Sequence, residues 1–211
     1  MSASVSTDLA AMVQAERRSL ATLLDSLTPE QWSAPTVCAK WNINDLVAHL
    51  VAGAHVTAPH FLGGLIKSRF SFNTYVERDV ALFNEGGPAA VKARFAETVD
   101  SKHKTPGPSY VALGEVMVHG EDIRNAVGTT GTYPEEHLVT LAELYKTAGA
   151  PLRAKKRIAG LRLQATDAEW ATGDGPTVSG PCMALIQAMV GRPAPLASCR
   201  GDGVDLLQSR C

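Results

Sequence analysis

The chain has 211 residues, of which 45% are hydrophobic and 19% charged. These values are ordinary for a globular protein and exclude extensive disorder. The formal net charge of -1 argues against a nucleic acid or an anionic membrane as the main partner. No apolar window reaches the roughly 18 residues of a membrane span, and residues 1–8 lack the basic start and apolar core of a signal peptide. We therefore expect a cytoplasmic protein.

The first half of the chain is predicted to be helical. Leucine, methionine and valine residues recur every three or four positions from about Thr7 to Leu27, which indicates a long amphipathic helix. A short helix should follow, with Thr28 as N-cap, Pro29 at its first position and Gln31 completing a capping box. Asn42 can then cap a second long helix.

Three histidines lie on or after this second long helix. His49 lies at the edge of the inward stripe and His55 lies opposite it. On a continuous helix, His60 is about 16 Å from His49, too far for one mononuclear site. At most one of the three can join a shared site, and His49 is the best placed.

Further helices are separated by glycine and proline breaks. Gly63, Gly64 and the basic residues 67–69 indicate a loosening of the chain, and residues 84–88 and 106–108 indicate turns. We expect helices over residues 75–83, 88–102, 109–127 and 133–148.

The pattern changes after residue 150. Leu161, Leu163 and Ala165 alternate with polar residues, which predicts a strand. Further strands are expected at 177–179 and 204–207, with a helix over 181–190 between them. We interpret the basic cluster at 153–157 as a solvated linker. The prediction is a mainly α protein: a helical domain over 1–150 and a small α/β C-terminal domain over 151–211, too small for a stable core of its own.

Glu115, His119 and Asp122 share one face of the helix predicted over 109–127. At about 100° per residue they lie within roughly 60° of one another. Apolar residues flank them, whereas Glu121 and Arg124 fall toward the opposite side. Burying a carboxylate and an imidazole without partners costs several kcal/mol, and a metal ion would satisfy both.

His49 together with Glu115 and His119 supplies two nitrogens and one carboxylate, suitable ligands for zinc or another first-row divalent ion. Three protein ligands leave a position for a water or a substrate atom, which favours a catalytic site. A di-iron bundle is disfavoured because only one helix carries such a set. The alternative is that Glu115 and His119 form a surface pair and that His49 is a hydrogen-bonded core histidine.

The four cysteines form no Cys-x-x-Cys pair and no zinc-knuckle or disulfide spacing. Separate thiols fit a reducing compartment. We assign all four to packing or to the surface, with no catalytic role: Cys38, Cys182, Cys199 and Cys211.

Two segments, Trp41 to Leu50 and Glu115 to Arg124, resemble the paired signature of the mycothiol-dependent maleylpyruvate isomerase family, within the DinB-like metal-binding bundles. The tail is similar to the C-terminal domain of that family, so the resemblance covers nearly the whole chain. The tail motifs are Ala165-Thr166-Asp167, Trp170, Gly173-Asp174-Gly175, Gly191-Arg192 and Gly201-Asp202-Gly203.

The resemblance implies a DinB-like four-helix bundle with a divalent metal, best matched by zinc, held by His49, Glu115 and His119. It also implies mycothiol as the thiol cosubstrate. A thiol on a divalent cation loses its proton, which supplies a nucleophilic thiolate at neutral pH. That thiolate adds reversibly to a cis double bond in the isomerase, or transfers to an electrophile in relatives.

Three further residues are candidates for supporting roles. Asp122 can orient an imidazole from outside the ligand set, or it is a surface carboxylate near Arg124 or Arg78. Arg192 and Arg210 are candidates for binding an anionic substrate, because guanidinium groups bind carboxylates in bidentate fashion. Their alternative role is that of surface or structural arginines.

Two functional hypotheses follow. The first is a metal-dependent enzyme that uses mycothiol as nucleophile, either an S-transferase or an isomerase, with a small electrophile as substrate and neither nucleic acid nor membrane as partner. The second is a non-catalytic bundle stabilised by a metal or by the Glu–His pair, with a pocket that binds a ligand or another protein.

Overall fold

The computed structural model describes residues 2–38, 40–101, 108 and 110–211. The chain divides into two compact units, Met1–Gly131 and Thr132–Cys211. Among the described residues, no helix combines the length and the apolar character that crossing a bilayer requires.

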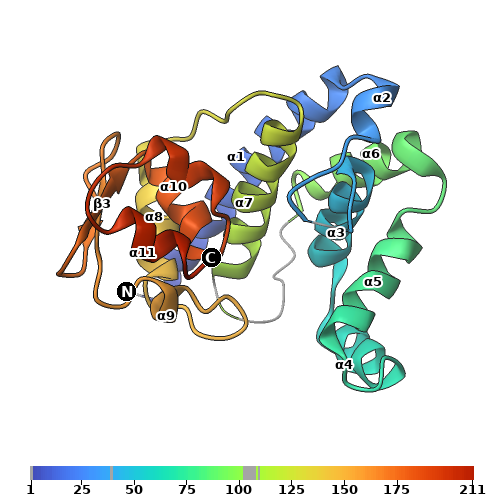
Figure 1. Cartoon of the computed structure of the whole chain (residues 1–211). Helices are drawn as coiled ribbons and strands as arrows, with labels where there is room; N and C mark the ends of the chain where they lie inside the picture. Colours follow the sequence, from blue (N-terminus) through green and yellow to red (C-terminus); the bar gives the residue numbers. More distant parts are fainter. Residues whose placement is uncertain (1, 39, 102–107, 109) are drawn as a thin grey trace. The chain divides into compact units, whose positions relative to one another are not determined.

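The first unit is a bundle of helices (Figure 1). Its long helices α1, α3, α6 and α7 form a closed ring of contacts, in which α1 packs on α6 and α7 and α3 packs on the same two helices. Leu20, Ile43, Phe95 and Met117, one from each of these four helices, are fully buried between them. The predicted four-helix bundle is confirmed. The helices of this unit are α1 (Ser2–Ser26), α2 (Pro29–Trp32), α3 (Ile43–His55), α4 (Ala58–Lys67), α5 (Phe72–Phe83), α6 (Gly87–Thr98) and α7 (Tyr110–Ala126).

The capping box predicted at the start of α2 is present, and Asn42 caps α3 as predicted and also forms a capping box with Asp45. Gln31 N donates to Thr28 Oγ1 at 3.3 Å and Thr28 N donates to Gln31 Oε1 at 2.9 Å. At the start of α3, Asp45 N donates to Asn42 Oδ1 at 2.9 Å and Asn42 N donates to Asp45 Oδ2 at 3.2 Å. These reciprocal bonds fix where α3 begins and hence the direction in which His49 points.

The predicted loosening is wrong at Gly63 and Gly64, because both glycines lie inside α4, and is confirmed at residues 67–69, where α4 ends and a turn follows. A Cβ at Gly64 would lie 2.6 Å from Tyr75 Cε2, whereas a Cβ at Gly63 would meet nothing within 4 Å. Gly64 therefore leaves room for the Tyr75 ring of α5. This requirement comes from tertiary packing, so the local sequence does not reveal it.

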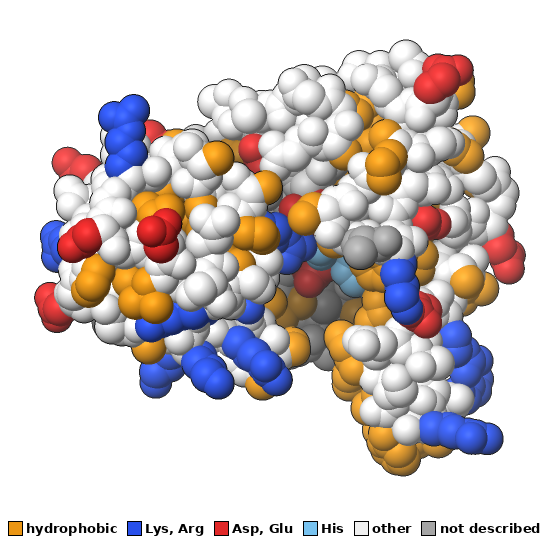
Figure 2. Space-filling model, viewed as in Figure 1, with side chains coloured by type: hydrophobic (Ala, Val, Ile, Leu, Met, Phe, Trp, Pro, Cys, Tyr) orange, Lys and Arg blue, Asp and Glu red, His pale blue; other side chains and the backbone are white. Residues whose placement is uncertain are grey.

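Hydrophobic side chains gather over the α4–α5 end of this unit (Figure 2), where Leu62, Ile66, Phe70 and Phe72 are exposed.

The distance between His49 and His60 was estimated for one continuous helix, but the helix that carries His49 ends before His60. It ends at His55, and α4 begins at Ala58 with Thr57 as its cap. His60 therefore belongs to another helix, where its Nε2 lies 3.1 Å from Asp79 Oδ2 of α5. The helix predicted over 88–102 ends at Thr98, and Pro106 and Gly107 of the predicted turn lie outside the described residues.

The second unit combines helices with a small sheet of order β2-β1-β3. Strand β1 is antiparallel to β2, with Leu163 opposite Thr172, and parallel to β3, with Leu163 opposite Val178. The helix α10 packs on β1 and β3. The elements are α8 (Glu135–Tyr145), α9 (Ala154–Arg157), β1 (Arg162–Ala165), β2 (Ala171–Thr172), β3 (Thr177–Gly180), α10 (Cys182–Met189), η1 (Ala194–Ser198) and α11 (Val204–Gln208).

The last strand, predicted over 204–207, is instead the helix α11. Leu207 is fully buried, and its N–H donates to Gly203 O at 3.0 Å in the first helical turn. The edge of β3 is already paired with residues that precede α11. Arg200 forms a β-bridge with Ser179, and the N–H of Gly203 donates to Thr177 O at 2.9 Å. One helical turn is therefore enough to bury Leu207, and no strand is needed.

The boundary between the two compact units lies near residue 131, whereas the domains were predicted as 1–150 and 151–211. The difference concerns α8, which packs on α10. Trp170 Nε1 donates to Glu143 Oε1 at 2.8 Å, and Glu169 N donates to Glu135 Oε1 at 2.6 Å. The small sheet thus obtains part of its core from α8, which suits a segment too short to bury a core by itself.

Candidate metal centre in the helical unit

Glu115, His119 and Asp122 lie along one face of α7, as their spacing predicts. His119 Nε2 is 3.5 Å from Glu115 Oε2, and His119 Nδ1 is 3.0 Å from Asp122 Oδ2. The two nitrogens of one imidazole therefore face two different carboxylates. Because the ring is planar and rigid, its orientation is fixed at both ends.

His49 reaches the same group from α3. Its Nε2 lies 2.8 Å from Glu115 Oε2, and its ring is 5.3 Å from the His119 ring in an edge-on arrangement at 87°. The centroid of the Trp41 ring lies 4.9 Å from that of the His49 ring, and this contact limits the rotation of His49. The structure thus brings together the three residues predicted as ligands.

The donor atoms of His49, Glu115 and His119 all lie within 4.8 Å of one another. A tetrahedral zinc ion with bonds of about 2.0–2.2 Å needs its nitrogen and oxygen ligands about 3.3–3.5 Å apart. The separations of 2.8 and 3.5 Å from Glu115 Oε2 are close to this requirement. The side chain of Glu115 is 37% exposed and that of His119 13% exposed, so solvent reaches the carboxylate.

Asp122 is buried, with 1% of its surface exposed. The interpretation of Asp122 as a surface carboxylate near Arg124 or Arg78 is therefore wrong. An ionised carboxylate accepts a hydrogen bond, so the 3.0 Å contact places the proton of His119 on Nδ1. The lone pair of the ring then lies on Nε2, which faces Glu115. This orientation is the one that a metal ligand requires.

The opposite side of α7 is also buried, although it carries two charged residues. Arg124 Nη2 donates to Ser19 Oγ of α1 at 2.9 Å, and Glu121 Oε2 accepts from Gly131 N at 2.9 Å. Each of these two residues is only 6% exposed. The helix that carries two of the three predicted ligands is therefore held by polar contacts on its far side as well.

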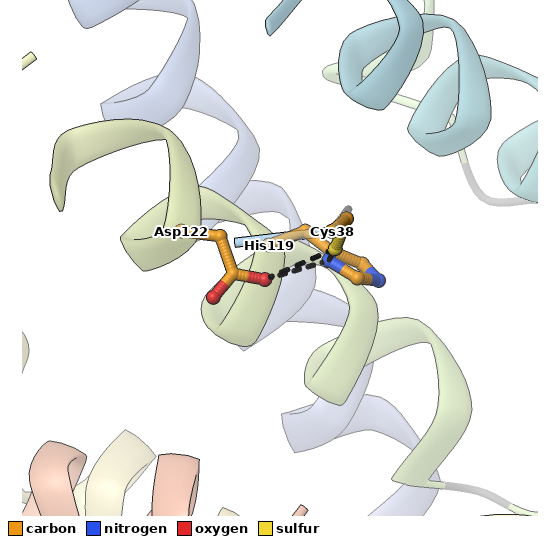
Figure 3. A group of neighbouring side chains, drawn as sticks. All are labelled: Cys38, His119 and Asp122. Atoms are coloured by element: carbon orange, nitrogen blue, oxygen red, sulfur yellow. Dashed lines mark hydrogen bonds and ion pairs between the residues drawn. The ribbon is translucent and has the colours of Figure 1, made fainter. Parts of the chain in front are cut away.

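Cys38 is the residue of this site that the sequence did not predict. Its Sγ lies 3.9 Å from His119 Nδ1 and 3.8 Å from Asp122 Oδ2 (Figure 3). Its backbone is held in the loop before α3, because Cys38 N donates to Thr36 Oγ1 at 3.2 Å and Trp41 N donates to Cys38 O at 2.7 Å. The only signal in the sequence was its position three residues before Trp41.

The other three cysteines lie in the second unit and are free thiols. Burial raises the pKa of the Cys182 thiol to about 12, with the negative charges of Asp167 and Glu135 adding to the effect. Burial also raises the pKa values of Cys199 and Cys211. A raised pKa keeps a thiol protonated and unreactive at neutral pH.

Arg192 and Arg210 both lie in the second unit. Arg210 Nη1 donates to Arg157 O at 2.8 Å and to Ala159 O at 2.7 Å, and Arg192 Nη1 donates to Val190 O at 3.4 Å.

Arg157, in the basic cluster at 153–157, donates to Arg210 O at 3.1 Å and to Leu152 O at 3.0 Å. The prediction of a solvated linker at 153–157 is therefore wrong for Arg157, which ties backbone segments together from α9, whereas Arg153, Lys155 and Lys156 are exposed to solvent.

Comparison with known proteins identifies the N-terminal part of the chain. Residues 13–107 match the family model of the mycothiol maleylpyruvate isomerase N-terminal domain. The match includes the motif from Trp41 to Leu50, so the resemblance to this family is confirmed. The helix α7 lies beyond the matched range. A search of the curated proteins finds no match.

Two solved structures share the fold of the whole chain. One is the crystal structure of the mycothiol-dependent maleylpyruvate isomerase, with a TM-score of 0.63 and 15% sequence identity over 93% of this chain and 92% of that one. The other is a mutant of that enzyme in which alanine replaces a histidine, with a TM-score of 0.63, 14% identity and the same coverage. At this level of identity the likeness establishes the fold, a helical bundle followed by a small α/β unit.

Proposed function

We propose that the chain, with its mycothiol maleylpyruvate isomerase N-terminal domain, is a metal-dependent enzyme that uses a low-molecular-weight thiol, mycothiol, as nucleophile. The reaction is either cis–trans isomerisation of a compound such as maleylpyruvate or S-transfer to a small electrophile. The observation that carries the proposal is the convergence of His49 from α3 with Glu115 and His119 from α7.

The donor set supports a divalent metal, and we propose zinc. Two imidazole nitrogens and one carboxylate oxygen are ligands that zinc accepts, and catalytic zinc sites keep three protein ligands and one open position. A divalent ion held there stabilises a thiolate over a thiol, which supplies the nucleophile at neutral pH. The partly exposed Glu115 side chain leaves a route by which a small thiol reaches the site.

The residues around the ligands set their geometry. Asp122 holds the proton of His119 on Nδ1 and directs the Nε2 lone pair toward Glu115. The Trp41 ring limits the rotation of His49. In the isomerisation, the thiolate adds to one carbon of the cis double bond, the resulting single bond rotates, and the C–S bond then breaks to restore the double bond in the trans form and return the thiolate. The protein has to position the nucleophile for these steps.

A second function is supported by one observation. His49, Glu115 and His119 already contact one another and join α3 to α7, so the same group could act only to stabilise the bundle, with a ligand or a protein as partner. A thiol-conjugation assay run beside thermal unfolding with and without chelator separates the two functions. Strong metal-dependent stabilisation without turnover of maleylpyruvate or any electrophile in a broad panel favours the non-catalytic bundle.

The remaining attributes belong to the same proposal. We place the enzyme in the cytoplasm, with mycothiol and a small electrophile as its partners and no role for a nucleic acid or a membrane. Arg192 and Arg210 remain predicted substrate-binding residues, although the bonds of Arg210 to two backbone carbonyls support a structural role.

The proposal is tested first by metal content. The purified protein, reconstituted with zinc and freed of excess ion, should retain about one divalent ion per chain at this three-ligand site. His119→Ala should lose it, whereas His60→Ala should retain it, because His60 pairs with Asp79 on other helices. Failure of the reconstituted wild-type protein to retain zinc would overturn the proposal.

A further inference from the structure

His119 belongs to two groups of three metal-binding side chains, one at each ring nitrogen. The first group contains Glu115, whose Oε2 lies 3.5 Å from Nε2, and His49, whose own Nε2 lies 2.8 Å from the same oxygen. The second contains Cys38 and Asp122, whose Sγ and Oδ2 both lie beside Nδ1 (Figure 3). The donor atoms within each group lie within 4.8 Å of one another. The second group supplies one sulfur, one nitrogen and one oxygen.

The separations in the second group are close to those of a metal site. Cys38 Sγ is 3.9 Å from His119 Nδ1 and 3.8 Å from Asp122 Oδ2, and the nitrogen and oxygen are 3.0 Å apart. Tetrahedral zinc, with a bond of about 2.3 Å to sulfur and about 2.0–2.2 Å to nitrogen and oxygen, needs these atoms about 3.3–3.6 Å apart. Shifts of a few tenths of an ångström would bring all three donors to coordination distance.

The group is held in place from two sides. The Asp122 side chain is fully buried on α7, and Cys38 is fixed by the hydrogen bonds of its own backbone to Thr36 Oγ1 and Trp41 N. Three donors from two separate segments therefore meet without a large rearrangement. Sulfur in the set favours thiophilic ions, such as zinc and cadmium, over magnesium or calcium.

The arrangement does not suit nucleophilic catalysis by Cys38. In a Cys–His–Asp relay the thiol contacts one ring nitrogen and the carboxylate orients the other. Here the thiol and Asp122 are both at Nδ1. Donors gathered around one point are the geometry of coordination, not of a relay.

We propose that Cys38, His119 and Asp122 form a second site for a thiophilic divalent ion and that its occupation excludes the ion at His49 and Glu115. A neutral imidazole has one lone pair. Coordination through Nδ1 moves the ring proton to Nε2, so His119 no longer serves the first site. On binding, the Cys38 sulfur forms the bond to the ion and its proton passes to the solvent. The existence of this site is independent of the proposed function, whereas its inhibitory effect rests on that function.

The test is a titration with cadmium chloride of the full chain carrying His49→Ala, which weakens the first site. Thiolate coordination to cadmium gives a charge-transfer absorption in the ultraviolet. We expect this band to saturate at about one cadmium ion per chain. Adding Cys38→Ser should abolish the band, and Asp122→Asn should weaken binding. Cys211→Ser is the matched control and should leave the band intact, because Cys211 belongs to the second unit and is not one of the three proposed ligands.

A band that is absent, or that persists unchanged in Cys38→Ser, would overturn the second site. If His49→Ala does not fold, the same titration of the wild-type chain applies, and Cys38→Ser must again remove the band.

Retention of zinc by Cys38→Ser but not by His119→Ala reports on the first site alone, so failure of the second site and failure of the proposed function are distinguishable. If the second site and the proposed function both hold, zinc in excess of one equivalent lowers the turnover of the wild-type enzyme but not that of Cys38→Ser. Each turnover rate is compared with the rate of the same protein at one equivalent of zinc.

Discussion

At the scale of single residues, the site depends on how His119 is oriented. Its ring is fixed because Asp122 binds Nδ1 from inside the bundle while Glu115 faces Nε2. A buried carboxylate that fixes the tautomer of a metal ligand typically changes metal affinity without touching the metal. The same Asp122 lies next to Cys38, so one carboxylate orients a ligand of the first group and is itself a donor of the second.

Asp122→Asn should weaken zinc binding at the first site by about 10–100-fold, because the amide is a poorer acceptor for the His119 Nδ1–H and carries no charge. A competition titration against a chromophoric chelator measures this affinity. Glu121→Gln is the control, since Glu121 is a carboxylate of the same helix but binds Gly131 N. Equal affinities for wild type and Asp122→Asn, with both folded, would contradict the role given to Asp122.

At the scale of elements, α3 and α7 carry the proposed ligands, and the start of α3 determines where His49 points. The capping box of Asn42 and Asp45 is local, with all its atoms within four consecutive residues. This is why the sequence correctly predicts Asn42 as the N-cap of α3, along with the capping box at Thr28 and the periodic helices; the part of Asp45 in a second capping box was not predicted. The face shared by Glu115, His119 and Asp122 follows from helical geometry alone and was predicted for the same reason.

Features that depend on distant partners were not predictable in this way. Gly64 was interpreted as a break because its neighbour Tyr75 is brought to it only by the packing of α5 on α4. The helical turn at Leu207 replaced a strand because the edge of β3 was already paired. The sequence assigns Cys38 to packing or to the surface, because Cys38 and His119 are 81 positions apart in the sequence and only the folding of the bundle brings them together.

Asn42→Ala should destabilise the zinc-free protein by about 0.5–2 kcal/mol, since the N–H of Asp45 in the first turn of α3 loses Asn42 Oδ1 as its acceptor. It should also weaken zinc binding, because the helix that presents His49 frays. Urea unfolding and the chelator competition measure the two effects. Thr28→Ala removes the equivalent cap from α2, which carries no ligand, and should cost stability without weakening zinc binding. A loss of zinc affinity that is equal in the two variants would contradict this account of α3.

Gly64→Ala and Gly63→Ala form a matched pair within α4. The first should destabilise the protein by about 1–3 kcal/mol, because its Cβ overlaps the Tyr75 ring. The second should stabilise it by up to about 1 kcal/mol, because alanine is the better helix former and its Cβ meets open space. Equilibrium unfolding in urea measures both, and changes of the same sign and size would refute the packing role of Gly64.

At the scale of the whole molecule, the three proposed ligands all belong to the first compact unit, and the small sheet of the second unit uses α8 for its core. The family match covers 13–107 and the shared fold extends over 93% of the chain. A metal that joins α3 to α7 binds the folded state and not the unfolded chain, so it should stabilise the protein by linkage.

Zinc at 100 times its dissociation constant should therefore raise the free energy of unfolding by about 2.7 kcal/mol. Chelator should remove this gain, and His119→Ala should show none. The comparison is made by thermal unfolding at a fixed protein concentration with zinc and with chelator. An unchanged midpoint in the wild-type protein at saturating zinc would show that no metal links the two helices.

The central claim is that a metal held by His49, Glu115 and His119 activates mycothiol. The most direct measurement is the rate of mycothiol-dependent turnover, with maleylpyruvate and with a panel of electrophiles, as zinc is added back to metal-free enzyme. We expect a rate that rises in proportion to zinc up to about one equivalent per chain and that is absent in His119→Ala. Turnover at the same rate without zinc, or no turnover of any substrate at one equivalent, would contradict it.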